Sequence, residues 1–500
     1  MNPVDYNDVQ GLARFGYARL TEASYLLLRV RNAEAARAWL AAAPVSSAAY
    51  LPSAPDTALQ IAFTPSGLSA MGVPRSAIDG FSAEFLDGMA GHASRSRRLG
   101  DVGKSAPARW RWGGPGRVPD LMVMLFVQQN LDRWQQTVQK APWEEAFETV
   151  HTLYTSNMGG HEPFGFMDGI SQPSFDWKRE QPIPANTTAY SNILALGELL
   201  LGYPNEYARY TDRPLLNPSA PGAGELLPAE DQPALKDLGL NGTYLVLRQL
   251  EQDVRGFWQY LDRVAGGAAD QRYRLGTAMV GRTLEGEPLI PPNREQVAGV
   301  TDQPGAPRNV FTYDHDPSGD ECPLGAHIRR ANPRNADLFG HPSEPVAVVA
   351  SQLAIPRPKP GDDLMASTRF HRLLRRGREY GIKLSPEEAC QPAPSDDPPR
   401  GLHFACLGAN IVRQFEFVQN AWLMSTRFDG LTEESDPLLG NRAAVGDCPV
   451  TGNFSIPRKG QLARRLTGVP QFITVRGGAY FFLPGLRALR YIAQAGAGVR

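Results

Sequence analysis

Hydrophobic positions in the first 157 residues follow two periods, one typical of strands and one typical of helices. Runs of aliphatic, aromatic and β-branched residues predict strands, and polar-faced stretches between them predict helices. Asn32 can cap the first helix, which ends before Pro44. The predicted strands span residues 23–30, 58–64, 121–127 and 148–156, and the predicted helices span residues 33–42 and 132–140.

The order strand–helix–strand–strand–helix–strand is that of a ferredoxin-like unit, an antiparallel sheet with both helices on one face. Residues 73–118 then form a long insertion between the second and third strands. We therefore expect an N-terminal ferredoxin-like domain over residues 1–160.

A second unit of this kind is expected after residue 240. Val254, Phe257, Leu261 and Val264 are spaced as on one face of a helix. Further strands are predicted at residues 243–247, 402–411 and 479–483, and further helices at residues 413–423 and from Leu486 onwards. The sequence thus predicts an α+β fold with a C-terminal domain over residues 161–500.

Composition narrows the classes of function. The chain has 51 Lys and Arg against 52 Asp and Glu, a net charge of −1, whereas an electrostatic nucleic-acid binder would show a basic excess. The 49 Gly and 43 Pro exceed the usual share, which indicates a loop-rich protein. Long Pro- and Gly-rich stretches usually line a site or are disordered, and they lie at residues 181–240, 281–325, 354–363 and 384–400.

The same sequence bounds the compartment. The N-terminus lacks the basic and apolar regions of a signal peptide, and the longest apolar run, Leu121–Val127, is too short for a membrane helix. Only four cysteines are present, none spaced as Cys-x-x-Cys, which argues against a disulfide scaffold and a zinc ribbon. We expect a cytoplasmic protein that does not bind membranes.

The segment Cys322–Arg334 (CPLGAHIRRANPR) carries the most specific chemical pattern. It places His327 in an apolar run and follows it with Arg329, Arg330 and Arg334. By itself this pattern fits a core histidine beside a solvated basic face. It also fits a haem site, in which one imidazole binds the iron and guanidinium groups bind the propionates.

Two other segments are less specific when taken alone. In Gly165–Gly169 (GFMDG), Asp168 is flanked by glycine, which fits either a simple turn or a carboxylate presented over a cavity. The basic segment Phe370–Gly381 (FHRLLRRGREYG) fits a solvated surface before a turn.

Together the three motifs resemble those of the dye-decolourising (DyP-type) haem peroxidases. The length suits the larger, bacterial-like branch of that family. The resemblance implies tandem ferredoxin-like units, the dimeric α+β barrel arrangement, with antiparallel sheets and long loop insertions, the second unit binding haem. It extends to Asp8–Leu12, Phe63–Leu68, Gly197–Tyr207, Asn241–Leu250, Arg413–Gln419 and Val475–Pro484.

The resemblance also implies roles for individual residues. His327 matches the proximal ligand of the haem b iron. Asp168, between Gly165 and Gly169 of the GxxDG motif, matches the distal acid–base, and Arg375 matches the distal arginine better than Arg376 does. The remaining expected cofactor contacts are Arg334 and, less strongly, Arg329 at the propionates, and Leu402 and Phe404 shielding the distal face.

In such a peroxidase hydrogen peroxide oxidises dyes, phenols or other small donors through a ferryl intermediate. Asp168 would move a proton between the peroxide oxygens, and Arg375 would stabilise the charge on the departing oxygen. Bulky dyes cannot pass Leu402 and Phe404, so a surface Tyr or Trp is expected to relay their electrons. Because a carboxylate remains a base to about pH 4, activity should persist into acid.

One position departs from the family pattern. Relatives place a carboxylate beside the proximal histidine, and the matching position here is Val412. Either Glu416 or a backbone carbonyl replaces it, or the iron is less electron-rich and the peroxidase weaker.

Two other functions stay open from the sequence. A haem-binding or haem-handling protein with weak turnover would use the same pocket, although storage needs neither Asp168 nor Arg375. A hydrolase built on Asp168 and another acid would be colourless. A homo-oligomer and an enclosing partner shell are compatible with the sequence.

Overall fold

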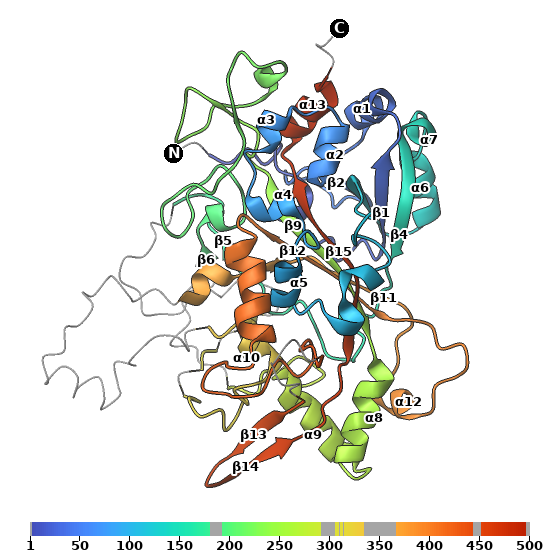
Figure 1. The fold of residues 1–500 in the computed structure, drawn as a ribbon, viewed down its shortest axis with the longest axis vertical. Coiled ribbons are helices and arrows are strands. Elements are labelled where there is room, and N and C mark those ends of the chain that lie inside the picture. Colours follow the sequence, from blue (N-terminus) through green and yellow to red (C-terminus); the bar gives the residue numbers. More distant parts are fainter. Residues whose placement is uncertain are drawn as a thin grey trace, which may run out of the picture.

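The computed structural model describes residues 3–180, 193–291, 306–309, 311–313, 315–334, 367–443 and 452–496. These residues fold around one antiparallel sheet of nine strands (Figure 1), ordered β10-β12-β9-β15-β2-β3-β1-β4, with β11 also paired to β12. The strands are β1 Glu22–Val30, β2 Thr57–Phe63, β3 Leu121–Val127, β4 Phe147–Tyr154, β9 Thr243–Gln252, β10 Leu374–Arg375, β11 Arg378–Tyr380, β12 Gly401–Gly408 and β15 Ile473–Leu483.

The first four strands and the last five form two adjoining parts of this sheet. They meet where β2 pairs with β15, through Phe63 and Phe482. The predicted α+β class and antiparallel sheet are confirmed. Within the described residues the sheet does not close into a barrel. The division into tandem ferredoxin-like units and the boundary at residue 160 stay predictions.

The strand predictions succeed where apolar residues are continuous. All seven residues of β3 are buried, as expected for a strand covered on both faces. β1, β2 and β4 begin and end within two residues of the predicted bounds. β15 is longer than predicted, because Arg476 and two glycines interrupt the apolar pattern of its first half.

The C-terminal helix packs together with two helices of the N-terminal half. The Asn32 side chain accepts hydrogen bonds from the N–H groups of Glu34 and Ala35 and so caps α1 Ala33–Ala42, as predicted. α1 packs against α7 Trp143–Ala146 and against the C-terminal α13 Leu486–Gln494 (Figure 1). The last helix is therefore part of the N-terminal half of the molecule.

Most other helices are short. α8 buries the apolar face predicted from its spacing, and residues 412–424 form wide, π-type helical turns in place of the predicted α-helix. The remaining helices are α2 Pro65–Ala70, α3 Arg75–Ile78, α4 Ala83–Asp87, α5 Ala93–Arg98, α6 Leu131–Val138, α8 Val254–Val264, α9 Ala269–Val280, α10 His327–Ala331 and α12 Pro386–Cys390, with the π-type turns at Val412–Glu416 and Val418–Met424.

Smaller strand pairs lie outside the main sheet. The hairpin of β13 and β14 projects from one end of the molecule (Figure 1). The pairs are β5 Ser174–Phe175 with β6 Ile193–Leu194, β7 Leu215–Leu216 with β8 Lys236–Asp237, and β13 Phe454–Arg458 with β14 Gln461–Leu466. The Pro- and Gly-rich stretch 354–363 lies outside the described residues.

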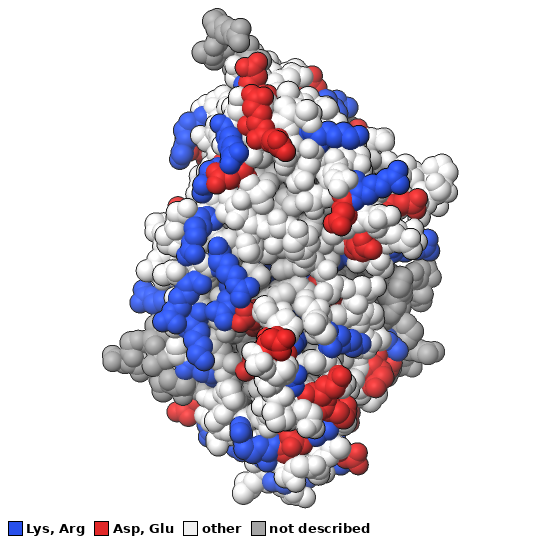
Figure 2. Space-filling view, turned by 90° about the vertical axis from the view of Figure 1, so that its right-hand side faces the viewer, with Lys and Arg blue, Asp and Glu red and all other residues white. Residues whose placement is uncertain are grey.

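The surface carries charges of both signs. Figure 2 shows acidic and basic side chains interspersed over one face, with basic ones gathered along one flank. Among the described helices none is both long and apolar enough to cross a bilayer.

Candidate active site

A large cavity lies on the face of the sheet formed by β9, β12 and β15. It leaves about 250 Å³ for the centres of water-sized molecules, and its walls are mainly apolar. His327 lines it together with Asp168, Arg375, Leu402 and Phe404, although these residues lie up to 236 positions apart in the chain. The structure thus gathers five of the predicted site residues around one space.

His327 is the first residue of α10 and is held by a buried carboxylate. Its Nδ1–H donates to Asp436 Oδ2 at 2.9 Å, and Asp436 is fully buried. Burial alone would lower the pKa of the His327 imidazole, but the Asp436 carboxylate raises it. With the proton fixed on Nδ1, Nε2 is the nitrogen that can bind a metal.

The expected partners of His327 are corrected by this contact. Glu416 instead accepts a hydrogen bond from Tyr480 at 2.9 Å and pairs with Arg95 at 2.8 Å, so it points away from His327. Val412, at the position matched to the family carboxylate, is 41% exposed. No backbone carbonyl takes over either, since Asp436 supplies the carboxylate from a loop.

Asp168 lies in a tight turn that the two glycines of its motif permit. Gly165 and Gly169 have φ angles of 101° and 78°, which favour glycine. Neither glycine lines the cavity. Their effect is to aim Asp168, whose N–H donates to Gly160 O at 2.9 Å and whose Oδ1 accepts from Gly169 N at 2.6 Å.

Arg375 meets Asp168 directly. Its Nη1 donates to Asp168 Oδ1 at 2.6 Å, and about a third of each side chain remains open to the cavity side. Burial alone would raise the pKa of the Asp168 carboxyl, but the Arg375 guanidinium and the Gly169 N–H hold it below its usual value. Asp168 is therefore kept as a carboxylate, the form that can accept a proton.

Several known proteins are similar to this chain in sequence and in fold. The multifunctional dye peroxidase of Amycolatopsis sp. is 31% identical over 355 residues, which cover 68% of this chain and 62% of that relative. A dye-decolorizing peroxidase of Auricularia auricula-judae is 28% identical over 468 residues, which cover 89% of this chain and 78% of that relative. A crystal structure of the fungal peroxidase of this type from A. auricula-judae has a TM-score of 0.70 at 25% identity, covering 99% of this chain and 100% of the other. The chain belongs to the dye-decolourising peroxidases.

Three findings define how far the similarity to known proteins extends. No family model matches the chain. The chain spans 62% of the length of the Amycolatopsis relative, so its substrates do not follow from that match. Bacterial and fungal members of the family both match the chain, so its place in the bacterial-like branch stays a prediction.

The two arginines predicted to contact the propionates, Arg334 and Arg329, differ in their position relative to the cavity. Arg334 is buried, lines the cavity and donates to Asn309 and to Phe311 O at 2.8 Å. Arg329 does not line the cavity, because its guanidinium donates to Asp316 at 3.0 Å and to Cys322 O. Arg329 thus forms a buried ion pair with Asp316 and lies outside the cavity lining.

A third arginine, not singled out from the sequence, lines the same cavity. Arg282 is 4% exposed, and its Nη1 donates to two backbone carbonyls, Gly286 O and Arg308 O. No ion pair joins it to a carboxylate of the described residues. Burial lowers its pKa to about 10, and Arg334 is a second positive charge nearby. A buried cation without a carboxylate is costly unless an anion binds beside it.

These features fit a haem. The cavity offers the imidazole of His327 with Nε2 available, apolar walls, and the buried guanidinium groups of Arg282 and Arg334, which suit carboxylates. Leu402 and Phe404 line the cavity as predicted, from the same face of β12 as expected for residues two apart.

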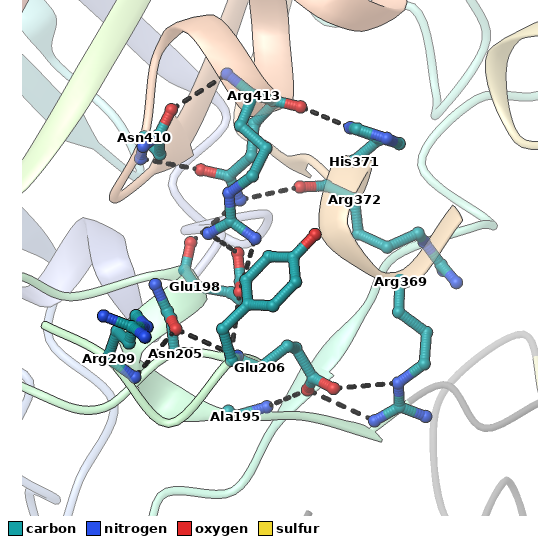
Figure 3. A network of polar contacts seen from close by, with 12 residues as sticks. Ala195, Glu198, Asn205, Glu206, Arg209, Arg369, His371, Arg372, Asn410 and Arg413 are labelled. Atoms are coloured by element: carbon teal, nitrogen blue, oxygen red, sulfur yellow. Dashed lines mark hydrogen bonds and ion pairs between the residues drawn. The ribbon is translucent and has the colours of Figure 1, made fainter. Parts of the chain in front are cut away.

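The wall that carries Arg375 is anchored by buried ion pairs (Figure 3). Arg369 pairs with Glu206 at 2.9 Å, and Arg413 pairs with Glu198 at 2.8 Å. Gln414 Nε2 also donates to Arg372 O at 3.0 Å. The segment that by itself fits a solvated basic surface is therefore a largely buried or half-buried wall, fixed before Arg375 emerges from it.

Glu162 is another residue that the sequence interpretation missed. It lines the cavity, and its carboxylate accepts from the N–H groups of Phe164 and Phe166 at 3.0 Å, closing the turn before Asp168. Burial raises its pKa to about 7. An acidic residue just before the GxxDG motif was the available signal.

Proposed function

We propose that this chain is a haem b peroxidase that uses hydrogen peroxide to oxidise dyes, phenols or other small donors. One observation carries the proposal: the Asp168–Arg375 pair and the His327–Asp436 pair face the same cavity. A carboxylate base beside a permanent cation is what peroxide cleavage needs, and an imidazole held by a carboxylate suits an iron ligand.

The residues have separate tasks in holding the cofactor. His327 Nε2 would bind the iron, and Arg282 and Arg334 would receive the propionates. Leu402 and Phe404 would cover the distal side. When bound, haem supplies an iron with one open position and the capacity to take up the oxidising equivalents of peroxide.

Asp168 performs the proton transfer. Its Oδ1 is engaged by Arg375 and Gly169, so Oδ2 is the oxygen that accepts a proton from the near peroxide oxygen and returns it to the far one. The far oxygen, once protonated, would leave as water, with the two electrons that cleavage of the O–O bond requires supplied by the bound haem. Arg375 stabilises the negative charge that grows on the departing oxygen.

Small phenols are the proposed donors that reach the cavity itself. A structure of similar fold at 23% identity is a complex with 2,6-dimethoxyphenol, which makes that phenol a suitable probe. Bulkier dyes would react at the surface. We also propose a cytoplasmic location and a homo-oligomer. The three described cysteines are unpaired, which is consistent with a cytoplasmic location.

Absorption spectroscopy of the purified protein tests the proposal. We expect a Soret band that shifts on addition of hydrogen peroxide and returns when 2,6-dimethoxyphenol is added. A colourless protein after haem reconstitution would exclude a haem function. A Soret band that peroxide does not change would favour the haem-handling alternative.

A further inference from the structure

Arg375 occupies an exposed edge of the main sheet. It belongs to the two-residue strand β10, which pairs with β12 on one side, and no described strand lies on the other side. Arg375 N and O point to that open side, because the neighbouring bond to β12 runs from Arg376 N to Ala405 O. The N–H and C=O groups of Arg375 thus form no hydrogen bond with a described strand.

The side chain of Gln172 occupies this open side. Its Oε1 accepts from Arg375 N–H at 3.0 Å, and its Nε2 donates to Arg375 O at 3.2 Å. These are the two bonds that a neighbouring strand residue would form with Arg375. One amide therefore takes the place of a neighbouring strand residue at this edge of the described sheet.

The same loop also holds the guanidinium of Arg375. Nη1 donates to Asp168 Oδ1 at 2.6 Å, and Nη2 donates to Ser171 O at 3.3 Å. Ser171 is itself fixed by Oγ–H donating to Asn309 Oδ1 at 3.0 Å. Residues 168–172 thus hold Arg375 at its backbone and at its side chain.

We propose that Gln172 is the positioning residue that sets Arg375 against Asp168. Its amide fixes the Arg375 peptide, which fixes where the guanidinium begins, and the guanidinium then orients Asp168 Oδ1. The inference rests on the proposed function, since it concerns how these two residues are aligned to act on peroxide. Without Gln172 the peptide of Arg375 loses both of its bonds to the loop, and only the guanidinium contacts remain to hold Arg375 there.

The pH at which Asp168 takes up its proton depends on this alignment. The charged groups that face it are Arg375 and His327, which favour its carboxylate, and Glu162 and Glu379, which oppose it. Of these only Arg375 is held by Gln172. Displacing Arg375 therefore raises the pH at which Asp168 takes up its proton.

The test compares Gln172→Met, which keeps the length and loses both bonds, with Gln172→Glu, which keeps an acceptor and loses the donor. Gln259→Met is the matched control, because Gln259 Nε2 donates to Ala389 O and Gln391 O and does not line the cavity. Asp168 is titrated by carboxyl carbon NMR in the haem-free protein, and the rate of reaction with peroxide is measured in the holoenzyme.

We expect Gln172→Met to raise the Asp168 midpoint by about one pH unit and to slow the peroxide reaction by about 10- to 100-fold. Gln172→Glu should lie between wild type and Gln172→Met, and Gln259→Met should match wild type in both measurements. A lower melting temperature with an unchanged Asp168 midpoint would show a structural role alone and overturn the proposal.

Two further outcomes keep the result decisive. If Gln172→Met does not fold, Gln172→Asn replaces it, with the amide one carbon shorter; an unchanged midpoint and rate in that variant overturn the proposal. If wild-type holoenzyme does not react with peroxide, the proposed function fails, while the haem-free titration still supports or refutes the positioning by Gln172.

Discussion

Asp436→Asn tests the most consequential contact of the cavity. The Asp436 carboxylate accepts the Nδ1–H of His327 at 2.9 Å, and its other oxygen accepts from Leu438 N and Leu439 N. An asparagine oxygen can keep the two backbone bonds. Its NH₂ group then faces His327 Nδ1, so the imidazole must move its proton to Nε2, the nitrogen meant for iron.

The expected loss of haem affinity follows from the burial of the hydrogen bond between Asp436 and His327. Loss of an outer partner of a metal-binding histidine costs about 10- to 100-fold in affinity, which corresponds to about 1.4–2.7 kcal/mol. A hydrogen bond to a charged group contributes about 1.5–3 kcal/mol, in agreement with that range. Because Asp436 is fully buried, solvent cannot replace the lost partner.

Haem affinity is measured by titrating haem into the haem-free protein and following the Soret band, in competition with a haem-binding reference protein. Asp316→Asn is the control, because Asp316 is 4% exposed and bonds Arg329 without contacting His327. Equal haem affinity in Asp436→Asn and wild type, or the same loss in both variants, would refute the reasoning.

Three further predictions concern proton transfer, cofactor binding and stability. Asp168→Asn should slow the reaction with peroxide by about 10²- to 10⁴-fold with haem still bound, measured by stopped-flow absorption; an unchanged rate would remove Asp168 from the mechanism. Arg282→Met should weaken haem binding by about 10-fold, whereas the exposed Arg263→Met should not; equal affinities would mean that Arg282 meets no propionate. Burial lowers the pKa of His403 to about 4, below the value of about 6.5 in an unfolded chain, so unfolding takes up a proton and stability falls as the pH drops from about 6.5 to 4. His403→Gln should remove up to about 3 kcal/mol of that loss, measured by urea unfolding of both proteins at pH 7 and pH 4.5, and parallel curves would contradict it.

The elements predicted best are those that local pattern determines. β3 matches its predicted bounds because seven apolar residues in a row allow little else, and α1 matches because Asn32 caps it. The strand order across the two halves was not predictable, because it depends on contacts such as Phe63 with Phe482, 419 positions apart.

Only the part of the cavity lining that stands in motifs was predictable from the sequence, and the residues that support it were not. His327, Asp168 and Arg375 stand in motifs, whereas Asp436 lies 109 positions from His327 with no motif around it. Arg329 was the weaker of the two predicted propionate contacts, and in α10 it pairs with Asp316. Which face of a short helix meets a cavity is decided by packing, which one sequence does not display.

The place of β15 in the sheet governs the order of events during synthesis. This strand, Ile473–Leu483, lies between β9 and β2, which both precede it by more than 200 residues. Chains leave the ribosome from the N-terminus, so neither the union of the two halves nor the floor supplied by Ile473 and Val475 exists until residues 473–483 have been synthesised. A product truncated before residue 473 would lack this floor, and we expect that adding haem does not rescue it.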